Sequence, residues 1–195
     1  MGVTGIILAG GKSTRMGTEK GLQELCGKPL INYAIDVLSG ICSNFIISSS
    51  SDAYQPLGFK VVPDEFSGIG PMGGIYSALR QSDTQDNLVI SCDLPFVSAE
   101  LLKFILSNSQ GYEVAVPWEG NMHYEPLCGF YNKSILDKIN TFIKTGNYKL
   151  PDLFEVIRIN KLVIDKTLHF YTDSLFYNVN SKLNLQTAEE IMRRG

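Results

Sequence analysis

The stretch Gly5-Ile6-Ile7-Leu8-Ala9-Gly10-Gly11, near the start of the chain, indicates the class of fold. A short apolar run that ends in glycines is typical of a strand buried on both faces, as in a parallel sheet. Similar apolar runs recur along the chain, and they alternate with segments whose apolar residues share one face of a helix. We therefore expect an α/β protein with a mostly parallel sheet flanked by helices.

The remaining elements are placed by the same alternation. Pro29 and Pro71 suit the first turn of a helix, Ser98 suits a helix cap, and Gly146 suits the end of a helix. No linker, repeat or low-complexity segment interrupts the pattern, so residues 1–195 are expected to form a single domain. Strands are expected at 45–47, 60–62, 88–90, 113–116, 127–131, 162–164 and 175–177, and helices over 29–38, 71–79, 98–106, 135–143 and through 188–191, with a short segment of unassigned type near 153–154.

Composition limits the class of protein. The 195 residues carry 17 Lys and Arg against 20 Asp and Glu, so the formal net charge is −3. A chain of this length buries roughly 70% of its unfolded surface and needs no disulfide or metal to form a core. Non-specific nucleic-acid binding requires a surplus of basic residues that is absent here. Any binding of anions must therefore be local.

The four cysteines and the absence of long apolar runs indicate the cellular setting. No Cys-x-x-Cys pair is present, and two histidines are too few for a typical zinc site, so we expect buried free thiols. No stretch approaches the roughly 18 consecutive apolar residues of a membrane span. We expect a soluble, cytoplasmic protein. The cysteines are Cys26, Cys42, Cys92 and Cys128.

Three candidate site elements follow strands of the expected sheet. They are the loop after the first strand, Asp64 and Asp93. Taken alone, each aspartate is more often a loop or capping residue than a functional one. In open α/β sheets, however, ligands bind outside the carboxyl ends of the strands. Three such elements at one edge predict a binding site there.

The loop from Gly10 to Lys20 has the composition of a phosphate site. Paired glycines let backbone amides approach an anion, and three cations against one acid give the loop a local charge of +2. This composition suits a triphosphate. Lys12 is equally well explained as a solvated surface lysine. The three cations are Lys12, Arg15 and Lys20, and the acid is Glu19.

Two familiar nucleotide motifs do not fit. Gly11-Lys12-Ser13 resembles the end of a P-loop, but that pattern requires glycine where the chain has Ile6. Residues 68–73 match Gly-x-Gly-x-x-Gly, but Pro63 to Ser67 separate them from the preceding strand, whereas the dinucleotide fingerprint follows its strand directly. Neither a P-loop nor a dinucleotide fingerprint is predicted.

Asp93 is the candidate metal ligand. It follows the strand at 88–90 and precedes Leu94-Pro95, so its carboxylate is expected at the sheet edge. Mg²⁺ in nucleotide sites is held by one or two carboxylates together with substrate phosphates. A single well-placed aspartate is therefore sufficient.

The motifs in this order resemble a known family. Leu8-Ala9-Gly10-Gly11, Arg15-Met16-Gly17 and Lys20 resemble the signature of sugar-nucleotide-pyrophosphorylase-like nucleotidyltransferases, which implies a Rossmann-like three-layer sandwich. Within that superfamily, the collinear set over most of the chain is similar to the molybdenum cofactor guanylyltransferase family. The further motifs are Lys20-Gly21-Leu22, Gly27-Lys28-Pro29-Leu30, Asp64 with Gly70-Pro71-Met72-Gly73-Gly74, Cys92-Asp93-Leu94-Pro95 and Asn178-Val179-Asn180.

The resemblance implies a reaction and a role for each matching residue. The reaction is transfer of GMP from GTP to the terminal phosphate of molybdopterin or its molybdenum form, with release of pyrophosphate and with Mg²⁺ as cofactor. Arg15, Lys20 and Asp93 are the implied catalytic residues, and Asp93 is the implied metal ligand. By position, Leu8, Ala9 and Gly10 would line guanine and ribose, Gly11, Ser13, Arg15 and Lys20 the phosphates, and Asp64 and Gly73 the nucleotide, with His123, Glu125, Pro126, Asn178 and Asn180 on the molybdopterin side.

One position departs from the family pattern. Family members often carry asparagine at the end of the second main strand, where it contacts the base, whereas this chain has Ser48. Serine is a shorter donor and acceptor, so recognition of the base must be shared with other groups or with water.

Three alternatives remain open at this stage. A molybdopterin cytidylyltransferase, or a transferase acting on an alcohol phosphate, would share the fold. A nucleotide-binding protein that delivers cofactor without catalysis would need no metal ligand and no cations around a leaving group. The implied partners are GTP and molybdopterin, with cofactor-insertion proteins and molybdoenzymes as further candidates. Neither nucleic acid nor membrane is expected as a partner, and the chain is expected to be a monomer or a weak homo-oligomer.

Overall fold

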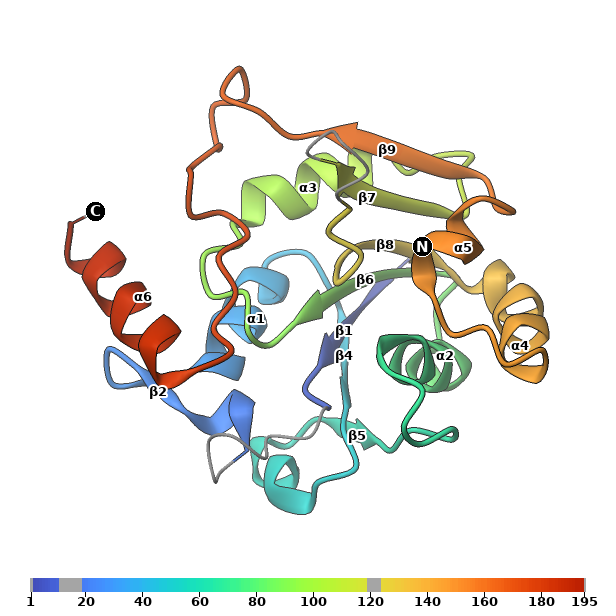
Figure 1. Ribbon diagram of the computed structural model, residues 1–195, viewed down its shortest axis with the longest axis horizontal. Coiled ribbons are helices and arrows are strands. Elements are labelled where there is room, and N and C mark those ends of the chain that lie inside the picture. The colour runs from blue at the N-terminus through green and yellow to red at the C-terminus, as the bar shows by residue number, and fades with distance from the viewer. Residues whose placement is uncertain (1, 11–18, 119–123, 195) are drawn as a thin grey trace.

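The computed structural model describes residues 2–10, 19–118 and 124–194, and it contains a central sheet of seven strands (Figure 1). The strand order is β5-β4-β1-β6-β8-β7-β9. Neighbouring strands are parallel except where β8 pairs with β6 and with β7. The expected mostly parallel sheet is confirmed. The strands are β1 Val3–Leu8, β4 Asn44–Ser48, β5 Lys60–Val62, β6 Asp86–Ser91, β7 Val114–Trp118, β8 Cys128–Asn132 and β9 Ile159–Val163.

Helices cover both faces of this sheet, as Figure 1 shows. Successive residues of a strand point to opposite faces, and β1 is apolar on both. Ile7 packs with α1 and α3, whereas Ile6 packs with α2, α4 and α5. The resulting three-layer sandwich was expected from the sequence. The helices are α1 Leu30–Ser39, α2 Pro71–Gln81, α3 Ala99–Ser107, α4 Leu136–Lys144 and α5 Leu150–Phe154, and the short 3₁₀ helices are η1 Lys20–Leu22, η2 Asp52–Leu57 and η3 Lys133–Ile135.

A third apolar cluster joins the C-terminal helix to a hairpin that the sequence analysis did not predict. The hairpin consists of β2 (Glu24–Leu25) and β3 (Lys28–Pro29), and α6 (Lys182–Arg194) packs on it. Two buried side chains, Leu25 of β2 and Ala188 of α6, belong to this cluster. The C-terminal helix is thereby fixed to the N-terminal part of the chain.

The turn of this hairpin corrects one expectation. Cys26 and Gly27 both have positive φ, 51° and 77°, as a two-residue type I′ turn requires. Cys26 is exposed at the turn, so the prediction of a buried thiol is wrong for this residue, while the other three cysteines are buried and free as predicted.

A second correction concerns the expected strand at 175–177. These residues form turns in which the Leu175 amide donates to the Thr172 carbonyl at 3.0 Å and the Tyr177 amide donates to the Ser174 carbonyl at 2.8 Å. The strand prediction is wrong because the apolar pattern reflects packing of a turn. Leu175 is 2% exposed and packs against the core without joining the sheet.

Other local predictions are confirmed. Ser98 caps α3, because its hydroxyl accepts a hydrogen bond from the Leu101 amide at 3.1 Å. Gly146 follows the end of α4 and has a φ of 75°. Within residues 2–10, 19–118 and 124–194, no helix is long and apolar enough to cross a membrane.

The buried carboxylate of Glu113, just before β7, binds Lys138 of α4 and the backbone just before β9. Both of its oxygens accept from Lys138 Nζ at 2.9 Å, and Oε2 also accepts from the Arg158 amide at 2.9 Å. Burial raises the pKa of the Glu113 carboxyl, but hydrogen bonds from Arg158 and Lys138 outweigh burial and hold its pKa below the usual value. The ionised form therefore stabilises the folded state.

We expect Glu113→Gln to lower the free energy of unfolding by about 1–2 kcal/mol at neutral pH. Because the folded-state pKa is lowered, the stabilisation is present above the unfolded-state pKa of about 4.3 and is lost as pH falls through the folded-state value. Urea unfolding at several pH values should show the two proteins converging in acid. A difference that stays constant over the whole pH range would contradict this assignment.

Candidate active site

The candidate site lies where the order of the strands changes direction. From β1 the chain moves outward to β4 and β5, and it then returns to β6 on the other side of β1. The crevice at such a point, beyond the carboxyl ends of the strands, is where α/β sheets bind ligands. The Ala9 amide donates to the Ser48 carbonyl and the Cys92 amide to the Leu8 carbonyl, both at 3.0 Å. The segments that follow β1, β4 and β6 therefore start side by side.

On the β6 side, three polar residues from distant parts of the chain meet. Lys20 Nζ donates to Asp93 Oδ2 and to Asn180 Oδ1. The Asp93 side chain is 8% exposed and that of Lys20 is 24% exposed, so the pair is largely shielded from water. A lysine ammonium is the countercharge that a buried carboxylate requires. Three residues proposed from the sequence are thus brought together.

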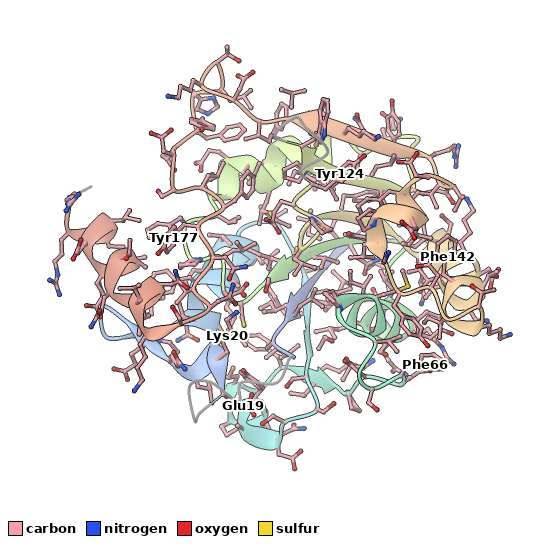
Figure 2. The ribbon with its side chains drawn as sticks, viewed as in Figure 1. Glu19, Lys20, Phe66, Tyr124, Phe142 and Tyr177 are labelled. Atoms are coloured by element: carbon pink, nitrogen blue, oxygen red, sulfur yellow. The ribbon has the colours of Figure 1, made fainter. Side chains whose placement is uncertain are left out.

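The C-terminal segment brings Asn180 to this position. The amide of Val179, which is fully buried, donates to the Asp93 carbonyl at 2.9 Å. The Asn180 amide donates to Asn184 Oδ1 at 3.3 Å, so the first turn of α6 also restrains Asn180. Figure 2 shows Lys20 beside the segment that leads into α6, with Tyr177 on the same segment.

Asp93 retains an acceptor that the described residues leave unused. Asp93 Oδ1 is buried and has no hydrogen-bond partner among the described residues. The same holds for Oδ1 of Asn178, which precedes Asn180 by two residues in the sequence. Buried unpaired oxygens of this kind fit a hard cation, which prefers oxygen ligands. Among the described residues no cluster of three or more His, Cys, Asp or Glu could hold a metal. A metal here would therefore need oxygens from its substrates as well.

On the β4 side, a serine and an aspartate form a second polar group. Ser48 Oγ donates to Asp64 Oδ1 at 3.3 Å. Burial raises the pKa of the Asp64 carboxyl, and the hydrogen bond from Ser48 opposes that effect. Ser48 is buried, so the acceptors available to a ligand on this side are chiefly those of Asp64.

Two adjacent glycines in α2 face different surroundings. A Cβ on Gly74 would lie 2.8 Å from Ser48 Oγ, 3.4 Å from Asp64 Oδ1 and 3.5 Å from Leu8, so this glycine lets α2 pack closely against the Ser48–Asp64 pair. A Cβ on Gly73 would instead meet the Phe66 carbonyl at 2.8 Å. Gly74 was not singled out as a site residue, although it belongs to the Gly-rich motif. The assignment of Gly73 to the nucleotide stays a prediction.

Glu125 and Pro126 reach the same edge because β8 is reversed. The antiparallel direction places the beginning of β8 beside the end of β6, where the Ser91 amide donates to the Leu127 carbonyl at 2.7 Å. Pro126 is held by its carbonyl, which accepts from the Tyr131 hydroxyl at 2.7 Å. Gly10 is exposed just after β1, with its Cβ position 3.7 Å from the Ser48 carbonyl oxygen. Five further residues lie outside the described part of the chain: Gly11, Lys12, Ser13, Arg15 and His123.

Comparisons with known proteins match this architecture. The family model described as "MobA-like NTP transferase domain" matches residues 5–161. A probable molybdenum cofactor guanylyltransferase from Pelotomaculum thermopropionicum is 37% identical over 95% of this chain and 91% of its own length. A molybdenum cofactor guanylyltransferase from Vibrio parahaemolyticus is 33% identical over 97% of this chain and 93% of its own length.

A solved structure is similar over the whole fold. The molybdopterin-guanine dinucleotide biosynthesis protein A from Archaeoglobus fulgidus aligns with a TM-score of 0.82 and 26% sequence identity. The alignment covers 98% of this chain and 100% of the other. The similarity therefore includes the C-terminal segment that carries Asn178 and Asn180.

Proposed function

The chain belongs to the family of MobA-like NTP transferase domains, and on this premise we propose that it transfers GMP from GTP to the terminal phosphate of molybdopterin or its molybdenum form. The observation that carries this proposal is the meeting of Asp93 and Asn180 at the Lys20 ammonium, beside the carboxyl end of β1. Of the relatives named above, one is named a probable molybdenum cofactor guanylyltransferase and another a molybdenum cofactor guanylyltransferase.

The proposed reaction needs no general base. A terminal phosphate is already largely ionised near neutral pH, so one of its oxygens can attack the α-phosphorus of GTP directly. A new bond forms between that oxygen and the α-phosphorus, the bond from the α-phosphorus to the bridging oxygen of the β-phosphate breaks, and pyrophosphate leaves. The main obstacle is repulsion between the two anionic reactants. The protein must therefore align them and supply positive charge.

Lys20 is the described residue best placed to supply that charge. Its ammonium is partly shielded from solvent, and Asp93 and Asn180 restrain it at the sheet edge. A cation held in a poorly solvated site stabilises a developing negative charge more strongly than a freely moving surface lysine does. Arg15 is proposed as a second phosphate ligand on the ground of its place in the motif.

Asp93 is proposed to hold Mg²⁺. Its buried and unpartnered Oδ1 is the acceptor that fits the ion, with substrate phosphates completing the set of ligands. When bound, Mg²⁺ supplies Lewis-acid stabilisation of the phosphate oxygens.

Asp64, with its partner Ser48, is proposed to face the nucleoside. The Asp64 carboxylate can accept hydrogen bonds from base N–H groups or ribose hydroxyls, and the close approach of Gly74 keeps α2 packed against the Ser48–Asp64 pair. On the opposite side of β1, Asn178, Glu125 and Pro126 are proposed to face molybdopterin. The acceptor phosphate would then approach the α-phosphate from the side of Asp93.

A direct assay separates this function from its alternatives. The purified full chain would be incubated with Mg²⁺ and either GTP or CTP, with and without molybdopterin, and both pyrophosphate and the dinucleotide product would be measured. We expect both products only with GTP and molybdopterin together. Equal or faster reaction with CTP would indicate a cytidylyltransferase. Tight GTP binding without any product would indicate a cofactor-delivery protein.

A further inference from the structure

Tyr54 lies outside every motif discussed above, yet it contacts Gly21, the residue that follows Lys20. It is fully buried in η2, between β4 and β5. Its hydroxyl accepts a hydrogen bond from the Gly21 amide at 3.2 Å. The hydroxyl is thus bonded to the backbone of the residue that follows Lys20.

The same hydroxyl is packed against the segment that carries Asp93. A Cβ on Gly21 would lie 2.9 Å from the Tyr54 hydroxyl and 3.4 Å from Cys92 Sγ. Gly21 is therefore enclosed between Tyr54 and the residue that precedes Asp93. We refer to Tyr54, Gly21 and Cys92 as the Tyr54 contact. Gly21 follows Lys20 and Cys92 precedes Asp93, so the Tyr54 contact lies beside the backbone of both residues.

Lys20 needs an anchor of this kind. Lysine is a compact charge on a flexible stem, so the position of the ammonium depends on how firmly its backbone is held. The helix that contains it, η1, has only three residues and no side-chain hydrogen bond at its N-cap. Figure 2 labels Glu19 and Lys20 at this short segment. The hydroxyl of Tyr54 supplies a tertiary restraint that the local structure lacks.

We propose that Tyr54 is a positioning residue for nucleotidyl transfer, whose hydroxyl fixes the backbone of Gly21, directly after Lys20, so that the Lys20 ammonium stays at the Asp93 carboxylate. This inference rests on the proposed function. Tyr54 acts through Lys20 and contacts no reacting atom. Burial of the hydroxyl, followed by the nearby Cys92 thiol, raises the pKa of Tyr54, so the hydroxyl stays protonated and uncharged throughout the neutral range.

The test removes the hydroxyl and leaves the ring. For Tyr54→Phe we expect kcat to fall about 10- to 100-fold, because small displacements of a catalytic group have effects of this size. The KM for GTP should change much less, since Ser48 and Asp64, proposed to face the nucleoside, hydrogen-bond each other and not Tyr54. Hydrogen exchange at the Gly21 amide should become faster than in the wild type, which reports the lost contact independently of activity.

A double variant tests whether the contact with Gly21 is direct. Gly21→Ala alone places a methyl group 2.9 Å from the hydroxyl oxygen, and this close approach is relieved in the Tyr54→Phe background. Gly21→Ala should therefore lower kcat by a smaller factor in that background than in the wild type. Equal factors in the two backgrounds would contradict a direct contact.

Tyr33→Phe is the matched control. Its hydroxyl donates to the Leu25 carbonyl at 2.7 Å and touches neither Lys20 nor Asp93, so kcat should stay near the wild-type value. A Tyr54→Phe variant with kcat within twofold of wild type, or a loss of kcat equal to that of Tyr33→Phe, would overturn the inference while leaving the proposed function intact. A wild-type protein that forms no dinucleotide would overturn the proposed function, and the inference with it.

Discussion

Replacing Asp93 by asparagine is expected to lower turnover by about a thousandfold, a loss of about 4 kcal/mol of transition-state stabilisation. Asparagine keeps the size of the side chain and one oxygen but removes the negative charge that a divalent cation requires. The fold should persist, because the backbone carbonyl of residue 93, which accepts from Val179, is unchanged. Pyrophosphate release at saturating GTP and molybdopterin measures the effect.

Asp173→Asn is the matched control for this variant. Asp173 is a highly exposed carboxylate whose lysine partner, Lys166, is 3.8 Å away and also exposed. Surface ion pairs of this type contribute little, so stability and turnover should both be nearly unchanged. Titration with Mg²⁺ should show weaker metal binding by Asp93→Asn, seen as a higher Mg²⁺ concentration at half-maximal turnover. Normal turnover and an unchanged Mg²⁺ profile would remove Asp93 from the mechanism.

Replacing Lys20 by methionine is expected to lower both turnover and stability. Turnover should fall at least about a hundredfold, because the cation proposed to stabilise the leaving pyrophosphate is lost. The Asp93 carboxylate would also lose its countercharge while remaining buried, and since Lys20 is partly exposed we expect a loss of about 2 kcal/mol. Urea unfolding without Mg²⁺ and the pyrophosphate assay measure the two effects separately.

Lys138→Met separates a catalytic lysine from a structural one. Lys138 pairs with the buried Glu113 carboxylate, far in the fold from the carboxyl end of β6, so its loss should lower stability while kcat remains close to wild type. Combining Lys20→Met with Asp93→Asn should recover part of the stability lost in Lys20→Met, because no unpaired buried charge remains. Additive stability losses in the double variant would show that the two side chains do not interact.

Local sequence pattern predicted most of the elements. The apolar run of β1 and the helical spacing in α1 and α2 are signals that depend on neighbouring residues, and the structure confirms them. The short β2–β3 hairpin was missed because two-residue strands carry almost no periodic signal. The segment 175–177 was wrongly predicted as a strand because burial of Leu175 produces the same apolar signal as a strand does.

The candidate site was predictable in part. Asp93 and Asp64 stand directly after buried strands, and Lys20 belongs to a glycine-rich, basic loop, so their residue types and positions pointed to the sheet edge. Gly74 could have been found from its place in the paired glycines after Pro71. Tyr54 offered no signal, because a buried tyrosine in a loop between strands has the same sequence pattern whether it packs the core or holds a site.

The sequence by itself determined the class of fold, the local charge of the first loop and the residue types at the strand ends, because these depend on spacing over a few residues. The tertiary structure decided which of those residues meet. Lys20 is 73 residues from Asp93 and 160 residues from Asn180 in the sequence, yet it hydrogen-bonds both. The reversed β8 brings Glu125 and Pro126 to the same edge of the sheet. Contacts over such separations depend on strand order and on the packing of α6, which no local pattern encodes.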